Sequence, residues 1–117
     1  MAIIPAYNPG DKIRIGNHAG TNLDGSSRDA FKDVLGVITD PTTVKVKLRK
    51  LPDGTAKVYG WPTPDTDGVL TKEATGRFYV DYTALSTDDA RWAWRLEGSG
   101  VITTADEGEF RILPTAF

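Results

Sequence analysis

Residues 44–49 carry the sequence Val-Lys-Val-Lys-Leu-Arg, in which apolar and basic side chains alternate without a break. Successive side chains of a β-strand point to opposite faces, so the alternation predicts a strand with one buried face and one wet, basic face. Pro52-Asp53-Gly54 then predicts a turn, because proline presets φ and glycine supplies a positive φ. We therefore expect a hairpin whose return strand runs over 55–61.

The same alternation returns in three later segments, 77–82, 91–97 and 107–112. Shorter strands are predicted over 12–15, 69–72 and 101–104. About seven or eight short strands, separated by Gly, Pro and Asp turns, predict an all-β fold, either a sandwich or a small barrel. The predicted core comprises Val44, Val46, Leu48, Phe78, Val80, Trp92, Trp94, Leu96, Phe110 and Ile112.

Length and composition limit the function classes. The 117 residues, with no Cys, fit a single domain over 1–117 without disulfides or thiolate metal sites. A net charge of −2 lacks the basic excess of a nucleic-acid binder. No apolar run approaches the roughly 18 residues of a membrane span, and the N-terminus lacks a basic leader. We therefore expect synthesis in the cytoplasm, and neither nucleic acid nor membrane as a partner.

One polar stretch, residues 18–33, interrupts the strand pattern. It contains Gly20, Gly25 and two serines, and its end, 27–33, fits one helical turn. Loops of this length in compact domains are usually functional or disordered. We expect a long polar loop or insertion.

The sequence contains few residues that could form a catalytic or metal site. His18 is the sole histidine, and Ser26 and Ser27 lie near it without an elbow motif, so a solvated loop histidine is the expected state. The segments 22–25 and 65–68 resemble the start of a calcium loop, but the later oxygen ligands do not follow. We expect no catalysis, no metal and no cofactor. Acidic pairs in turns are interpreted as solvated surface: Asp88 and Asp89, and Asp106, Glu107 and Glu109.

Two further features bear on binding. Tyr59 and Trp61 lie beside a loop, where an exposed pair would suit a sugar ring or a protein, whereas a tryptophan folded back would cover an open sandwich edge. The basic row Lys45, Lys47 and Arg49, with Lys50 and Lys57 near it, fits either an electrostatic interface or a solvated strand face.

The segment 88–94, Asp-Asp-Ala-Arg-Trp-Ala-Trp, resembles the entry to strand F of an immunoglobulin domain. Trp92 stands where that fold has its corner tyrosine, and Trp94 where it has a disulfide cysteine. A tryptophan lacks the tyrosine hydroxyl, so its indole N–H needs an acceptor of its own. The favoured fold is an immunoglobulin-like antiparallel β-sandwich.

Several turns and core positions form a recognisable set: Pro9-Gly10-Asp11, 40–44, Pro52-Asp53-Gly54, Gly76-Arg77-Phe78-Tyr79, 92–98 and 107–112. In these segments, most of the chain outside 18–33 and 61–67 resembles a family of small immunoglobulin-like structural proteins of tailed bacteriophages. The resemblance implies a virion component at the head–tail neck, in the connector or stopper region, or on the head surface. The longer polar stretch near the start departs from the family pattern.

We therefore expect a non-catalytic virion protein that assembles through its loops and termini. Expected partners are portal or connector, capsid or tail proteins, and further copies of the chain in a ring. A capsid decoration protein is the first alternative. A carbohydrate- or surface-binding module using Trp61 and Tyr59 is the second. The predicted contact residues are Ile3, Ile4, Tyr7, His18, Asn22, Arg28, Phe31, Tyr59, Trp61 and Phe117.

Overall fold

The computed structural model describes residues 4–20 and 28–114, and every regular element in these ranges is a β-strand. The helical turn expected at the end of the polar stretch is not formed over 28–33. In chain order the strands are β1 (Ala6–Tyr7), β2 (Lys12–Gly16), β3 (Thr43–Lys50), β4 (Ala56–Trp61), β5 (Gly68–Val69), β6 (Thr71–Ala74), β7 (Arg77–Thr83), β8 (Ala90–Ser99) and β9 (Thr104–Ile112).

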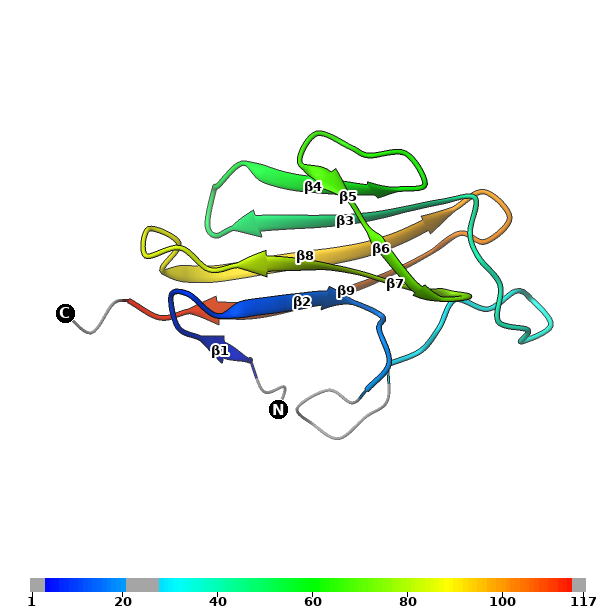
Figure 1. Cartoon of the computed structure of the whole chain (residues 1–117), viewed down its shortest axis with the longest axis horizontal. Coiled ribbons are helices and arrows are strands. Elements are labelled where there is room, and N and C mark those ends of the chain that lie inside the picture. The colour runs from blue at the N-terminus through cyan, green and yellow to red at the C-terminus, as the bar shows by residue number, and fades with distance from the viewer. Residues whose placement is uncertain (1–3, 21–27, 115–117) are drawn as a thin grey trace.

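The strands form two packed sheets (Figure 1). The larger sheet has the order β1-β9-β8-β3-β4-β5, and the smaller has the order β2-β7-β6. In immunoglobulin domains strand F lies between G and C, while B, E and D share the other sheet. Here β9-β8-β3 and β2-β7-β6 repeat these two orders. The predicted immunoglobulin-like sandwich is thus confirmed. Its pairings are antiparallel, except that β1 runs parallel to β9 and β5 parallel to β4.

The described strands number nine rather than seven or eight because some are too short to show alternation. β1 and β5 have two residues each. The single strand predicted over 69–72 is divided at Leu70, where the chain leaves the larger sheet and enters the smaller one. Leu70 is buried and its N–H donates to the carbonyl of Gly60 at 2.9 Å. The strand predicted over 101–104 is a turn, and β9 begins at Thr104.

The core lies between the sheets where the alternation predicts it. Val44, Val46 and Leu48 of β3 are completely buried, as is Phe78 of β7. Rings from both sheets meet there, since Trp92 and Phe110 stack at 6.0 Å and Tyr82 reaches Trp92 from the smaller sheet at 5.8 Å. Nine of the ten predicted core residues are buried.

Trp94 is the exception, because it is only half-buried. The register gives it the same face as its cross-strand neighbours Leu48 and Gly108. Its indole lies across Gly108, where a side chain's Cβ would come within 2.5 Å of Nε1. Glycine therefore leaves the space that the indole occupies, and the ring leans toward β9 instead of filling the centre. The prediction of a fully buried Trp94 is wrong for this reason.

Trp92 reproduces the immunoglobulin corner with a different donor. Its indole Nε1–H donates to the backbone carbonyl of Asp88, four residues upstream, at 2.9 Å in a buried site. The Asp88 carboxylate accepts from the Tyr82 hydroxyl at 2.6 Å and from the Leu85 N–H at 2.9 Å. Burial raises the pKa of Tyr82, and its bond to Asp88 raises it further. The corner thus ties the β7–β8 turn to the core.

Arg14 of β2 and Asp81 of β7 stand directly opposite each other and form a two-point ion pair, with Nε–Oδ1 2.8 Å and Nη2–Oδ2 3.0 Å. The hydrogen bond from Arg14 lowers the pKa of Asp81, against the opposing effect of partial burial. A carboxyl with a lowered folded-state pKa stabilises the fold above its unfolded pKa of about 3.9, and that contribution is lost as pH falls through the folded value.

We therefore expect Asp81→Asn to lower the melting temperature at pH 7 more than at a pH where the folded carboxyl is protonated. Thermal unfolding of both proteins across acidic and neutral pH measures this difference. Asp89→Asn makes the same substitution at an exposed carboxyl that has no ion-pair partner among the described residues. It is the control and should change the melting temperature little at either pH. An equal loss for Asp81→Asn at every pH would contradict the assignment.

Candidate interaction surface

The two most exposed apolar side chains among the described residues lie in one short hairpin, Asp33–Ile38, which we call the apolar tip. Val34 is fully exposed at 101%, and Leu35 is 83% exposed. Val37 is 57% exposed, and Ile38 is 48% exposed. Single exposed apolar residues are ordinary, but a contiguous group marks an interaction site more often than not.

The apolar tip is held by its own hydrogen bonds. The Asp33 N–H donates to the carbonyl of Val37 at 2.9 Å, and the Gly36 N–H donates to the carbonyl of Asp33 at 3.0 Å. The Asp33 carboxylate oxygen Oδ1 also accepts from the N–H groups of Leu35, at 2.9 Å, and Val37, at 3.0 Å. These bonds satisfy the turn backbone from within, so Val34 and Leu35 are presented by a defined turn.

The base of the apolar tip is fixed to the sandwich. Phe31 is buried, and its ring lies 6.1 Å from that of Phe78. Its N–H donates to the carbonyl of Gly76 at 2.9 Å, and its carbonyl accepts from Thr39 at 3.0 Å. On the other side Asp40 accepts from the Gly76 N–H at 2.7 Å and pairs with Lys72. The tip is therefore mounted on a rigid part of the fold.

A second exposed apolar residue lies at the same end of the molecule. Val101, in the turn between β8 and β9, is 74% exposed. Figure 1 shows this turn and the hairpin that follows residue 31 projecting from the right-hand end of the sandwich. A partner that covers the apolar tip from this end can reach both turns.

The predicted contact residues are scattered over the fold. Ile4 is 40% exposed. Tyr7 is half-buried in β1, with its ring edge-on to Phe110 at 6.1 Å, so this terminal segment belongs to the larger sheet. Arg28 is half-buried, and its carbonyl accepts from Arg77 at 3.2 Å. Phe31 is buried, so its side chain is not available for contact with a partner. Ile3, Asn22 and Phe117 lie outside the described residues.

His18 is buried, which corrects its interpretation as a solvated loop residue. The chain leaving β2 is held against β7, because Asn17 accepts from the Phe78 N–H at 2.8 Å and donates to Gly76 at 2.8 Å. The imidazole then packs edge-on against Tyr79 at 6.1 Å. Burial lowers the pKa of His18, and the charges of nearby arginines lower it further. The neutral ring is therefore the favoured form.

Tyr59 and Trp61 are half-buried and pack against the core. The Trp61 ring lies 4.7 Å from the Phe78 ring, and the Lys72 ammonium lies 5.7 Å from the centre of the Trp61 ring. Burial raises the pKa of Tyr59. This is the arrangement expected of side chains that close a sandwich edge, and the two rings do not stand free as an aromatic platform.

The described residues contain no group of three or more potential metal ligands. Within the same ranges no helix is long and apolar enough to cross a membrane. The sequence did carry one usable signal for the apolar tip. Val34-Leu35-Gly36-Val37-Ile38 is a short apolar run between Asp33 and Asp40 that fits none of the predicted strands.

No protein-family model matches the chain, and none of the curated proteins compared with it matches.

Proposed function

We propose that this protein is a non-catalytic structural component of a tailed-phage virion, in the connector or stopper region of the head–tail neck. It binds a neighbouring virion protein with the apolar tip. The turn and core motifs, such as Pro9-Gly10-Asp11 and residues 92–98, support the phage assignment, since they resemble that family. The sandwich topology agrees with the fold that the resemblance implies.

The observation that carries the proposal is the apolar tip. A β-sandwich positions its end loops rigidly, and such loops are the usual carriers of binding residues. Burying one Leu or Val side chain contributes about 1.5–3 kcal/mol, so Val34 and Leu35 together supply a useful but limited affinity. In a particle with many copies, limited affinities at several sites combine through avidity. The tip therefore suits an assembly protein better than an isolated pairwise binder.

We expect the double substitution Val34→Ser and Leu35→Ser to leave the melting temperature nearly unchanged, because neither side chain packs in the fold. Removing both side chains should weaken docking by at least about a hundredfold. The measurement is the copy number of the protein in purified phage particles that are assembled with the variant. Particle fractions that separate the neck from the capsid also distinguish the neck proposal from a capsid decoration protein.

Leu85→Ser is the matched control. Leu85 is 56% exposed and lies in the β7–β8 turn, at the opposite end of the sandwich (Figure 1). The Leu85→Ser protein should be incorporated into particles at the normal copy number. Normal incorporation of the double variant would overturn the role of the tip. Cleavage of a glycan or peptide by the purified protein would overturn the assembly function as a whole.

A further inference from the structure

The outer face of the larger sheet, which is separate from the apolar tip, carries a net positive charge. We call the outward-facing side chains of β3, β8 and β9 the cationic face. Six cations and three carboxylates give this face a formal charge of +3, and the remaining eight cations and thirteen carboxylates leave −5 on the rest of the chain. The charged members are Lys45, Lys47, Arg49, Arg91, Arg95, Arg111, Glu97, Glu107 and Glu109.

Two pairs of like charges stand directly opposite each other across neighbouring strands of this face. Lys47 faces Arg95, and Arg91 faces Arg111. Like charges in directly opposed positions destabilise a sheet. The glutamates relieve part of this repulsion, since Glu97 lies 3.1 Å from the Lys47 ammonium and 2.7 Å from Nε of Arg95. Opposed like charges lower the stability of the sheet, so their presence indicates that the positive charge has a functional role.

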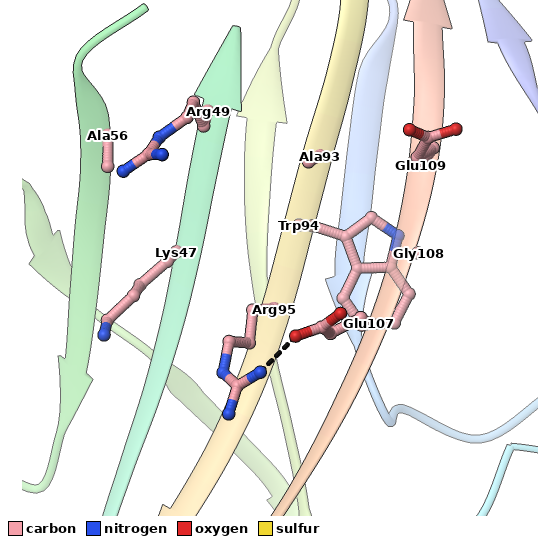
Figure 2. Close-up of a pocket in the computed structure, with 9 residues that line it drawn as sticks. All are labelled: Lys47, Arg49, Ala56, Ala93, Trp94, Arg95, Glu107, Gly108 and Glu109. Carbon is pink, nitrogen blue, oxygen red and sulfur yellow. Dashed lines mark hydrogen bonds and ion pairs between the residues drawn. The ribbon is translucent and has the colours of Figure 1, made fainter. Parts of the chain in front are cut away.

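A shallow hollow of about 520 Å³ lies within the cationic face (Figure 2). Ala56 and Ala93 are the two cross-strand neighbours of Arg49, so methyl groups stand on both sides where a carboxylate would otherwise pair with it. Figure 2 shows Arg49 extending toward Ala56 on β4, while Arg95 is engaged by Glu107. The small residues thus leave room above the sheet beside an arginine.

Most charged side chains around the hollow form ion pairs with other described residues, but Arg49 does not. Glu107 pairs with Arg95, Glu109 with Arg91, Lys47 with Glu97, and Lys45 with Asp65 from the β4–β5 loop. Arg49 is exposed and has no ion-pair partner among residues 4–20 and 28–114. A guanidinium is suited to two-point hydrogen bonding with a carboxylate. Because a guanidinium binds phosphates in the same two-point manner, the unused donor in the hollow suits an anionic oxygen group of either kind.

We propose that the cationic face binds a carboxylate-bearing surface of another protein, and that Arg49 receives one Asp or Glu side chain of that partner in the hollow. The three glutamates divide the cations into separate positions, which suits single carboxylates on a protein surface better than the evenly spaced charges of a phosphate backbone. A two-fold pairing of the face with itself would place +3 against +3, which disfavours a symmetric dimer of the chain. The inference goes beyond the proposed function and does not depend on the apolar tip.

The test titrates the full-length protein, labelled with ¹⁵N, with a synthetic peptide of alternating Glu and Ala. Its amide resonances on β3, β8 and β9, and the Nε–H of Arg49, should shift together. Arg49→Glu should weaken binding by about tenfold, and Arg49→Lys by a few-fold, because an ammonium cannot replace the two-point contact. Lys12→Glu makes the same charge change on the smaller sheet and should leave binding within about twofold.

Each other outcome overturns the proposal. Shifts confined to other surfaces, or equal losses for Arg49→Glu and Lys12→Glu, would show a non-specific charge effect. Tighter binding of a short DNA duplex to the same face would assign it to nucleic acid. Self-association in sedimentation experiments that Arg49→Glu abolishes would assign it to a second copy. The double substitution in the apolar tip should not change peptide binding. The test of the cationic face is therefore independent of the test of the proposed function.

Discussion

Replacing Trp92 with alanine is expected to lower the free energy of unfolding by about 4 kcal/mol, within the usual range for a buried tryptophan. The side chain is 3% exposed, stacks on Phe110 at 6.0 Å and meets Tyr82 from the opposite sheet. Its removal leaves a cavity and also an acceptor, the Asp88 carbonyl, without its donor. A domain of this size has about 5–15 kcal/mol of stability in total, so between about a quarter and about four fifths of it would be lost. Denaturant unfolding measures the change.

Two controls separate the contributions of Trp92. Trp92→Phe keeps an aromatic ring in the stack but removes the indole N–H, so its cost should be clearly smaller and should report the corner bond together with the lost ring area. Trp94→Ala removes the same atoms from a half-buried position over Gly108 and should also cost less than Trp92→Ala. Equal costs at Trp92 and Trp94 would mean that the division of roles between the two residues is wrong.

Substituting alanine for Gly16 is expected to cost about 3 kcal/mol or more, although the change adds a single methyl group. The φ of Gly16 is +148°, and a Cβ built there lies 2.1 Å from the carbonyl oxygen of Phe78 and 2.8 Å from the Cα of Tyr79. Both contacts are with the backbone of the paired strand β7, so no side chain can move aside. Strained backbone alone costs about 1–3 kcal/mol, and the collision forces β2 away from β7 in addition.

Gly10→Ala is the matched control for this substitution. Gly10 also has a positive φ, +93°, but a Cβ there meets nothing within 4 Å. Its cost should be confined to the backbone preference, about 1–2 kcal/mol. Comparing the two melting curves therefore isolates the collision with β7. If both variants lose the same stability, close packing at Gly16 is not what holds the two strands in register.

Strand alternation predicts the centre of this fold because it depends only on which side chains share a face. Val44, Val46 and Leu48 were expected inside the sandwich, and all three are completely buried. β1 and β5 have two residues each, too few to show alternation, and β1 is held by pairing to β9 at the other end of the chain. The half-exposure of Trp94 depends on the glycine opposite it, which the sequence of β8 alone does not contain.

The candidate site was harder to predict because exposure is a property of the whole structure. A run such as Val34-Leu35-Gly36-Val37-Ile38 is compatible with a buried strand, and its exposure follows from the hydrogen bonds of Asp33 and the anchoring of Phe31. His18 shows the reverse case. A polar neighbourhood in sequence suggested solvent, yet the bonds of Asn17 carry the residue inside.

The parallel pairing of β1 with β9 also determines how the protein responds to mechanical load. Near the two chain ends, the Arg111 N–H donates to Pro5 and the Leu113 N–H donates to Tyr7, both at 2.8 Å. Because the two strands run in the same direction, a pull on the chain ends in opposite directions slides one strand along the other. These bonds are then loaded in shear together, whereas an antiparallel terminal pair would be peeled apart one bond at a time. Force transmitted through the ends of this chain would therefore load this pair of strands in shear.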